Sequence, residues 1–354
     1  MAFPGTFALA MPAVIGGGAN FGTIDIDGVV YSTNQIYTRE GYESPNPTYT
    51  SQLSPVLGQG HNNADNIITV TEKPVQVKVQ LWGGAGGNGN SLNSGENQGG
   101  GAGEYRHATF LLQPGQYTLM LGNGGTVSYY SNSYGGGGYG GGGGAAGYNG
   151  SAYVNGTHGT AFGNGGQNTS FAASTLGWAG GGGGMTGLFD TLTKSQATSL
   201  LIAAGGAGGS SWYNNSSSGH TTKRAPGGGD NDASLYGGNG AGRGQGGWGG
   251  IVQGVGSTMT GGGGGGYIGG KRQTNNYSLG GQGYTHGDAT DTFQENGERG
   301  KGSASHGAAA FAEPGGTDQP NYIDGRGDGA STSTTPDTGN GGLAAITILA
   351  ARRS

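Results

Sequence analysis

Runs of consecutive glycines limit what this chain can fold into. YGGGGYGGGGG spans Tyr134–Gly144, and further runs lie at Gly180–Gly184, Gly237–Gly250 and Gly261–Gly266. Glycine loses more backbone entropy on folding than any other residue, so such runs usually act as flexible linkers. They can be ordered if they form extended helices of the polyproline II type, with three residues per turn, whose backbone groups bond sideways to neighbouring segments. The absence of a Cβ permits that close approach.

Composition favours an ordered glycine lattice over disorder. Glycine accounts for 89 of 354 residues, whereas ordinary proteins contain about 7%. Disordered chains combine low hydrophobicity with high net charge, but this chain has a net charge of −5 and carries 18 Tyr and 9 Phe. The glycines keep no sustained G-X-Y period, which argues against a collagen triple helix.

Charge, cysteine content and hydropathy exclude several functions. The only basic cluster is Arg352–Arg353, so we expect no binding to nucleic acid. The sequence has no cysteine, which excludes disulfides and thiolate metal sites. No apolar run approaches the roughly 18 residues of a membrane helix, so we expect no membrane insertion.

Alternating residues predict strands on both sides of the glycine-rich region. In VQVKVQLW, Val75, Val77 and Val79 fall on one face, and the polar residues between them fall on the other. EYRHATFLL predicts a second strand, which Pro114–Gly115 would join to QYTLMLG as a hairpin. LAAITIL predicts a closing strand near the end of the chain. The strands are expected at 67–82, 104–122 and 343–350, around polyglycine segments at 123–342.

These features predict an all-β fold. Strands that must pair across a long insertion imply a β-sandwich or jelly-roll-like base, from which the glycine-rich insertion projects as a packed bundle. Within the insertion, the spacing in Leu188–Ala203 is compatible with a short helix, with Asp190 as its N-cap, and Leu200–Ala204 is compatible with a buried strand.

Residues 1–65 differ from the glycine-rich domain at 66–350. Gly22–Thr38 alternates apolar and polar residues and predicts a short β-hairpin, followed by an extended arm. Two interpretations remain. The segment is an arm that attaches the protein to a larger assembly, or it supplies the first strand pair of the main domain and a surface loop.

The order of the motifs adds a resemblance. A strand ending in LWGG is followed by GGAGE, then by the pattern L-x-PG-x-Y-x-L-x-x-G-x-GG, and a last strand follows GG. Over roughly Ile67 to Ala350, this order resembles the glycine-rich domain of tail-fibre and appendage proteins of tailed bacteriophages. It is also similar to the glycine-rich region of anaplastic lymphoma kinase-type receptors. The lack of cysteine and of a kinase or membrane segment favours the phage version.

The resemblance implies a fold and a function. It implies a β-sandwich base, a bundle of polyglycine II helices packed side by side, and connecting loops that touch the host surface. We therefore expect a non-enzymatic tail fibre or adhesin at the virion surface, in an extracellular location. Its expected partners are other virion proteins, contacted through the N-terminal arm, and a host-surface glycan or outer-membrane protein. Fibre-type appendages are expected to form homotrimers. The alternative is a purely structural capsid-appendage or fibre-forming matrix protein that binds no receptor.

Catalytic signals are weak. The closest phosphate-loop match, Gly265–Lys271, is followed by Arg272 where Ser or Thr should bind Mg²⁺. The six histidines lack metal-site spacing, and nothing in the sequence selects a carboxylate pair for glycoside cleavage. The carboxylates considered are Asp190, Asp230, Asp232, Glu295 and Glu298. We expect no catalytic residue, metal site or cofactor.

Aromatic residues beside glycine are the candidates for binding, because Tyr and Trp offer a large contact area at low entropy cost. At any one position, sealing the flank of the lattice is the competing role. The candidate binding residues are Tyr129, Tyr130, Trp212, Tyr213, Tyr236, Tyr267, Tyr277 and Tyr284. The glycines expected to be structurally essential are Gly135, Gly140, Gly142, Gly181, Gly183, Gly261, Gly263 and Gly265.

Overall fold

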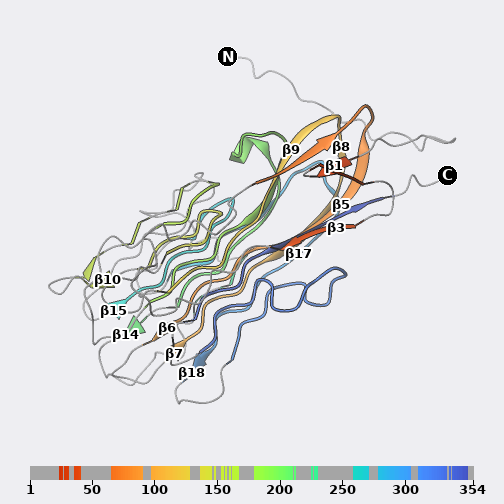
Figure 1. The fold of residues 1–354 in the computed structure, drawn as a ribbon. Helices are drawn as coiled ribbons and strands as arrows, with labels where there is room; N and C mark the ends of the chain where they lie inside the picture. Colours follow the sequence, from red (N-terminus) through yellow and green to blue (C-terminus); the bar gives the residue numbers. More distant parts are fainter. Residues whose placement is uncertain are drawn as a thin grey trace.

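Two antiparallel sheets form one end of the molecule, and glycine-rich segments extend from them (Figure 1). The computed structural model describes residues 24–26, 28–31, 36–40, 65–90, 97–127, 136–145, 147–148, 153–154, 156–157, 159–160, 162–166, 179–209, 211–212, 225, 227–229, 258–270, 278–303, 310–332, 335 and 337–349. Within these residues the regular secondary structure is almost entirely strand, as the sequence predicts. The described residues include no helix with the length and apolar character needed to cross a membrane.

The larger sheet has seven strands in the order β16-β13-β12-β9-β4-β1-β2. In chain order these are β1 (Ile24–Ile26), β2 (Val29–Tyr31), β4 (Asn66–Val70), β9 (Gly115–Met120), β12 (Thr186–Phe189), β13 (Ser199–Ala203) and β16 (Tyr284–Thr285). The second sheet has five strands in the order β17-β8-β5-β19-β3. These are β3 (Ile36–Glu40), β5 (Val75–Trp82), β8 (Tyr105–Leu112), β17 (Thr290–Glu295) and β19 (Leu343–Ile348).

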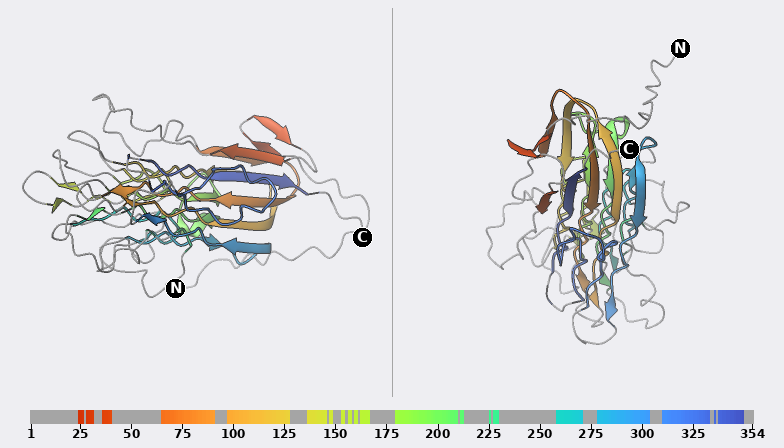
Figure 2. Two further views of the ribbon diagram at one scale, coloured as in Figure 1. Left: turned by 90° about the horizontal axis from the view of Figure 1, so that it is seen from below. Right: turned by 90° about the vertical axis from the view of Figure 1, so that its right-hand side faces the viewer.

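Short strands pair at the opposite end of the molecule (Figure 1). They are β6 (Gly89–Asn90), β7 (Asn97–Gln98), β10 (Gly147–Tyr148), β11 (Tyr153–Val154), β14 (Ser211–Trp212), β15 (Thr258–Met259) and β18 (Gly302–Ser303). Between the two ends, the glycine segments run side by side, as two further views also show (Figure 2). The molecule is therefore elongated, with the two large sheets at one end and these seven short strands at the other (Figure 1 and Figure 2).

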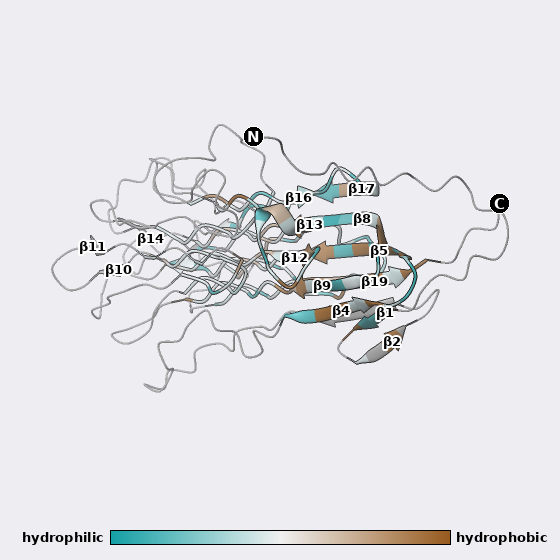
Figure 3. Cartoon of the chain, turned by 90° about the horizontal axis from the view of Figure 1, so that it is seen from above, coloured by the Kyte–Doolittle hydropathy of each residue, from teal (hydrophilic) through white to brown (hydrophobic). Residues whose placement is uncertain are grey.

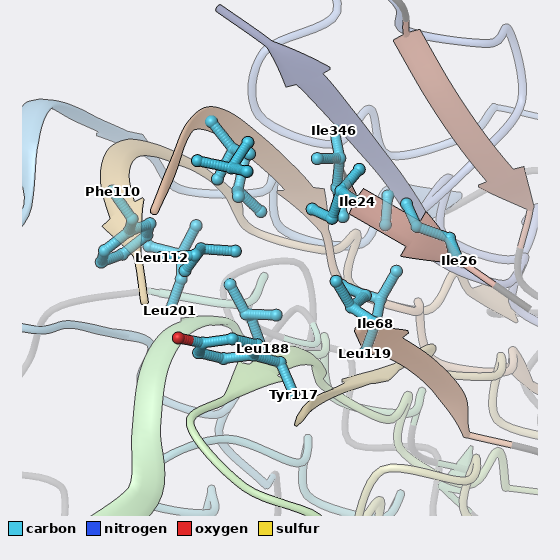
Figure 4. Packing of buried hydrophobic residues seen from close by; sticks show 14 of the residues in the cluster. Ile24, Ile26, Ile68, Phe110, Leu112, Tyr117, Leu119, Leu188, Leu201 and Ile346 are labelled. Atoms are coloured by element: carbon cyan, nitrogen blue, oxygen red, sulfur yellow. The ribbon is translucent and has the colours of Figure 1, made fainter. Parts of the chain in front are cut away.

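One hydrophobic core lies between the two sheets (Figure 4). Phe110 and Leu112 enter it from the five-stranded sheet, and Tyr117, Leu188 and Leu201 enter it from the seven-stranded sheet. Strand alternation explains this, because successive side chains point to opposite faces. Hydrophobic residues are accordingly concentrated in the strands, whereas the glycine segments are pale in Figure 3.

The predicted hairpin at Pro114–Gly115 is wrong. The two strands, β8 and β9, form on either side of that turn, but β8 pairs with β5 and β17, whereas β9 pairs with β4 and β12. The apolar faces of both strands are buried in the same core. A hairpin would place them side by side in one sheet, so the connection instead crosses from one sheet to the other.

The short helix predicted after Asp190 is also wrong. Thr186–Phe189 is strand β12, and the only helical turn in the described residues is the 3₁₀ helix η1 (Gln196–Thr198). Ser195 caps this turn by accepting a hydrogen bond from the Thr198 N–H. The turn joins two strands of one sheet, and that pairing outweighs local helix preference. The strand predicted at Leu200–Ala204 is present as β13.

The N-terminal strands belong to the two main sheets. β1 pairs with both β2 and β4, and β3 pairs with β19. For the residues that the structure describes, these pairings agree with the interpretation in which the segment supplies strands of the main domain. The predicted extended arm lies largely at 41–64, outside the described residues.

Backbone hydrogen bonds connect the glycine segments with a period of three residues. In the segment 83–88, residues i and i+3 donate to the same neighbouring segment. The pairs are Gly83 to Glu104 and Gly86 to Gly101, Gly84 to Gly184 and Gly87 to Gly181, and Ala85 to Asn340 and Asn88 to Asp337. These bonds are 2.8–3.0 Å long. The N–H groups of three successive residues therefore point in three different directions.

Three more segments donate to the carbonyl groups of 83–88. Gly206 and Gly209 donate to Gly84 and Gly87, Gly125 donates to Ala85, and Ala330 donates to Gly86. The segment 83–88 is thus surrounded by six other backbone segments. The segment 180–185 repeats the pattern, since its residues donate in turn to 206–209, 123–126 and 140–143.

Candidate binding site

The structure describes the side chains of two of the eight candidate aromatic residues, Tyr267 and Tyr284. Their rings stack on each other, with 4.2 Å between the ring centroids and 11° between the planes. We call these two residues the tyrosine pair. Tyr129, Tyr130, Tyr213, Tyr236 and Tyr277 lie outside the described residues, and Trp212 lies in β14 without a described side chain.

The tyrosine pair lies on the outer face of the seven-stranded sheet. Tyr284 belongs to the edge strand β16, where it is opposite Ile202 of β13. Leu201 points into the main core, so its neighbour Ile202 points away from it. Tyr267 follows the glycine run at 261–266, and its carbonyl accepts a 2.8 Å hydrogen bond from Gln196 Nε2. The pairing of β16 with β13 therefore positions Tyr284, and the hydrogen bond from Gln196 positions the backbone at Tyr267.

A second apolar cluster supports the tyrosine pair. Tyr267 and Tyr284 pack against buried residues of this cluster, which are Met120, Tyr139, Phe162, Met185, Phe189 and Ile202. Phe162 contacts Phe189 edge to face, at 5.4 Å between centroids and 83° between planes. Phe162 is buried, and its φ of 51° is a backbone conformation that non-glycine residues seldom adopt. The support beneath the tyrosine pair is a packed layer.

Polar groups lie next to the tyrosine pair. His286 Nδ1 is 3.4 Å from Asp288 Oδ2, and these side chains are 39% and 51% exposed. Burial raises the pKa of Tyr284, and the neighbouring Tyr267 and Asp288 raise it further. Partial burial raises the pKa of Asp190, and the nearby His286 opposes that shift. The polar groups beside the tyrosines thus include two carboxylates and an imidazole.

The positive charge of Lys194, two residues before Gln196, is balanced by a neighbouring carboxylate. Lys194 Nζ is 2.6 Å from Asp65 Oδ2, and it donates a 2.7 Å hydrogen bond to the Tyr139 hydroxyl. That hydroxyl donates in turn to Asp65 Oδ1 at 2.9 Å. Burial raises the pKa of Tyr139 above its usual value, so the phenol stays protonated in this triangle. This triangle of contacts joins the turn at Tyr139 to Lys194, in the loop between β12 and β13.

The glycines that the sequence predicts to be structurally essential lie within the hydrogen-bonded segments, except for Gly135, which is outside the described residues. A Cβ added at Gly140, Gly142, Gly181, Gly183, Gly261 or Gly265 would overlap a backbone atom of a neighbouring segment. Gly263 accepts a hydrogen bond from the Gly143 N–H. The close approach that the sequence predicts is therefore present at the positions that the structure describes.

A polar network on the other sheet was not expected from the sequence. The Tyr105 hydroxyl accepts from Gln80 Nε2 at 2.9 Å and lies 2.9 Å from His107 Nδ1. The same hydroxyl donates to Gln319 Oε1 at 3.5 Å, and the tautomer of His107 decides whether it donates to Nδ1 or accepts from it. Nε2 is 3.9 Å from Asp291 Oδ1, and Phe293 stacks on the imidazole at 5.6 Å.

We expect His107 to titrate below the ordinary histidine value. Burial lowers its pKa, Lys78 lowers it further, and Asp291 opposes the shift. The folded state therefore favours neutral His107, and this contribution to stability is lost as the pH falls below the unfolded value of about 6.5. An NMR titration of the His107 imidazole should give a midpoint below 6.5. In His107→Gln, the corresponding part of the acid destabilisation should disappear, and a midpoint above 6.5 would contradict the network.

The carboxylates considered for catalysis are not gathered in one place by any contact in the described residues. Glu295 accepts from the Gly316 N–H, whereas Glu298 accepts from the Glu313 N–H and pairs with Lys301. Asp190 lies near His286, and Asp230 and Asp232 are outside the described residues. Within the described part of the chain, no three His, Asp or Glu side chains converge as metal ligands.

Comparison with known proteins identifies no matching family model and no matching curated protein.

Proposed function

We propose that this protein is a non-enzymatic virion appendage, a glycine-rich tail fibre or adhesin of a tailed bacteriophage. In this proposal the glycine segments form a bundle of polyglycine II helices on a β-sandwich base. The bundle acts as a stiff spacer, and aromatic residues on and between its segments contact the host surface. The observation that carries the proposal is the three-residue period of the hydrogen bonds around 83–88.

This period supports polyglycine II helices in particular. A helix with three residues per turn points every third N–H in the same direction, which matches the donors of 83–88, 99–104 and 180–185. The described glycines of these segments also avoid positive φ, a conformation that occurs elsewhere, at Gly140, Gly141 and Gly229 for example. Each backbone bond contributes only about 1 kcal/mol net. Rigidity would come from the large number of bonds acting together.

The architecture suits a spacer. Described glycine segments extend between the two large sheets and the short strands at the opposite end (Figure 1). In the sequence, several candidate aromatic residues lie between glycine-rich segments, Tyr129 and Tyr213 among them. In the proposed assembly, the N-terminal region contacts other virion proteins, three copies associate, and the aromatic residues contact a host glycan or outer-membrane protein.

Host adsorption tests the proposal. We expect particles carrying Tyr213→Ala, Tyr277→Ala and Tyr284→Ala together to assemble normally and to lose adsorption to the host. Unchanged adsorption would favour the purely structural appendage instead. Antibody labelling in electron micrographs should place the protein at the particle surface, and light scattering of the purified protein should give the mass of a trimer. A label found only inside the particle would contradict the proposal.

A further inference from the structure

We propose that the tyrosine pair, with its polar neighbours, binds uncharged pyranose sugars. This inference rests on the proposed function and narrows it, because it assigns one ligand class to one described site. The structure places two stacked, partly exposed aromatic rings beside side chains that can bond hydroxyl groups. Those side chains are Asp190, Gln196, His286 and Asp288.

The apolar part of the site is preorganised. The C–H face of a pyranose ring is flat and apolar, and tyrosine offers it a large surface with little loss of side-chain entropy. The two rings are nearly parallel at 11° and rest on the buried cluster that contains Phe189 and Ile202. Tyr284 is fixed in a paired strand. Binding of a ligand would therefore cost little entropy for ordering this surface.

The polar part suits hydroxyl groups. Carboxylates accept hydrogen bonds from two directions, and imidazole can both donate and accept. His286 and Asp288 are substantially exposed, and Asp288 lies close enough to Tyr284 to influence its pKa. Groups of this kind around an apolar surface give orientation and specificity to a small-molecule site.

Charge argues for an uncharged sugar. Asp190 and Asp288 both lie beside the tyrosine pair or its neighbour His286. Of the cations that the structure describes beside this region, Lys194 is paired with Asp65 and Arg106 is paired with Glu104. A sialate, uronate or phosphate group would meet these two carboxylates, and both of these described cations are already engaged, which disfavours anionic ligands.

Calorimetry on the purified full chain tests this inference. The probes are uncharged trisaccharides built from glucose, galactose or N-acetylglucosamine, together with sialyl-lactose and trigalacturonate as anionic probes. We expect at least one uncharged probe to bind and both anionic probes to bind more weakly. Tyr267→Ala should weaken binding about tenfold, because it removes the stacked ring. Tyr267→Phe should stay within about twofold, because it keeps the ring.

Further variants separate binding from folding. Phe293→Ala removes an exposed aromatic residue on the other sheet and should leave binding unchanged. Tyr284→Leu keeps an apolar residue in β16, so it should lose sugar binding with a melting temperature close to that of the parent. The inference is overturned if no uncharged probe binds, if the anionic probes bind as tightly, or if Tyr267→Ala binds normally. If adsorption still depends on the aromatic residues in that case, the proposed function stands without this sugar site.

Discussion

Replacing Gly183 by valine should prevent the chain from reaching its folded state. Gly183 donates a hydrogen bond to Gly206 and accepts one from Gly265, both at 2.8 Å. A Cβ at this position would overlap the carbonyl group of Gly84. That carbonyl belongs to a hydrogen-bonded backbone segment and cannot rotate away as a side chain can. The neighbouring segments must separate, so we expect a loss above about 4 kcal/mol, seen as insoluble protein or a lost cooperative melting transition.

Gly287 provides the matched control. A Cβ added there would meet nothing within 4 Å, and its φ lies outside the range that favours glycine. Gly287→Val should therefore fold and melt within a few degrees of the parent, because surface substitutions usually change stability by about 0.5 kcal/mol or less. Equal melting temperatures for the two variants would show that close backbone approach is not what holds the segments together.

The strands of the base could be predicted because their side chains alternate. Val75, Val77 and Val79 are all fully buried, as their alternation with polar residues predicts. The partner strands were harder to assign. The turn at Pro114–Gly115 has hairpin chemistry, but the apolar faces on both sides of it fill the same core from opposite sheets. Local turn preference does not distinguish a hairpin from such a crossing.

Pairing among the glycine segments could not be predicted for a different reason. A run such as 261–266 has no side-chain pattern, so every register between two runs looks alike from the sequence. Strands at the ends fix the register, as where β5 leads into 83–88 and β12 follows 180–185. The stacking of Tyr267 on Tyr284 depends on this register, and neither residue carries a local signal of the other. The contact between Glu104 and Arg106 did have a local signal in the sequence, because residues two apart along an extended segment lie on the same face.

The second large effect is expected where the sheets meet the glycine segments. Glu104 is fully buried and accepts hydrogen bonds from Arg106 Nε at 2.7 Å and from the Ala204 N–H at 2.9 Å. Arg106 Nη1 also donates to Thr285 Oγ1 at 3.2 Å. Arg106→Leu would leave the carboxylate buried without its cation, which typically costs about 3–5 kcal/mol. Urea denaturation at neutral pH should measure a loss of this size.

The pH dependence of this variant identifies its cause. Burial raises the pKa of Glu104, and Arg106 opposes that shift, so removing Arg106 raises the pKa further. When the pKa of a carboxyl group is higher in the folded state than in the unfolded state, the fold loses stability as the pH rises above the unfolded pKa, which is near 4.5 here. Arg106→Leu should therefore be much less destabilised at acid pH, relative to the parent, than at neutral pH. Glu104→Gln combined with Arg106→Leu should recover most of the loss at neutral pH, because the amide carries no charge. If Arg106→Leu is equally destabilised at both pH values, lost packing of the arginine side chain is responsible rather than an unpaired buried charge.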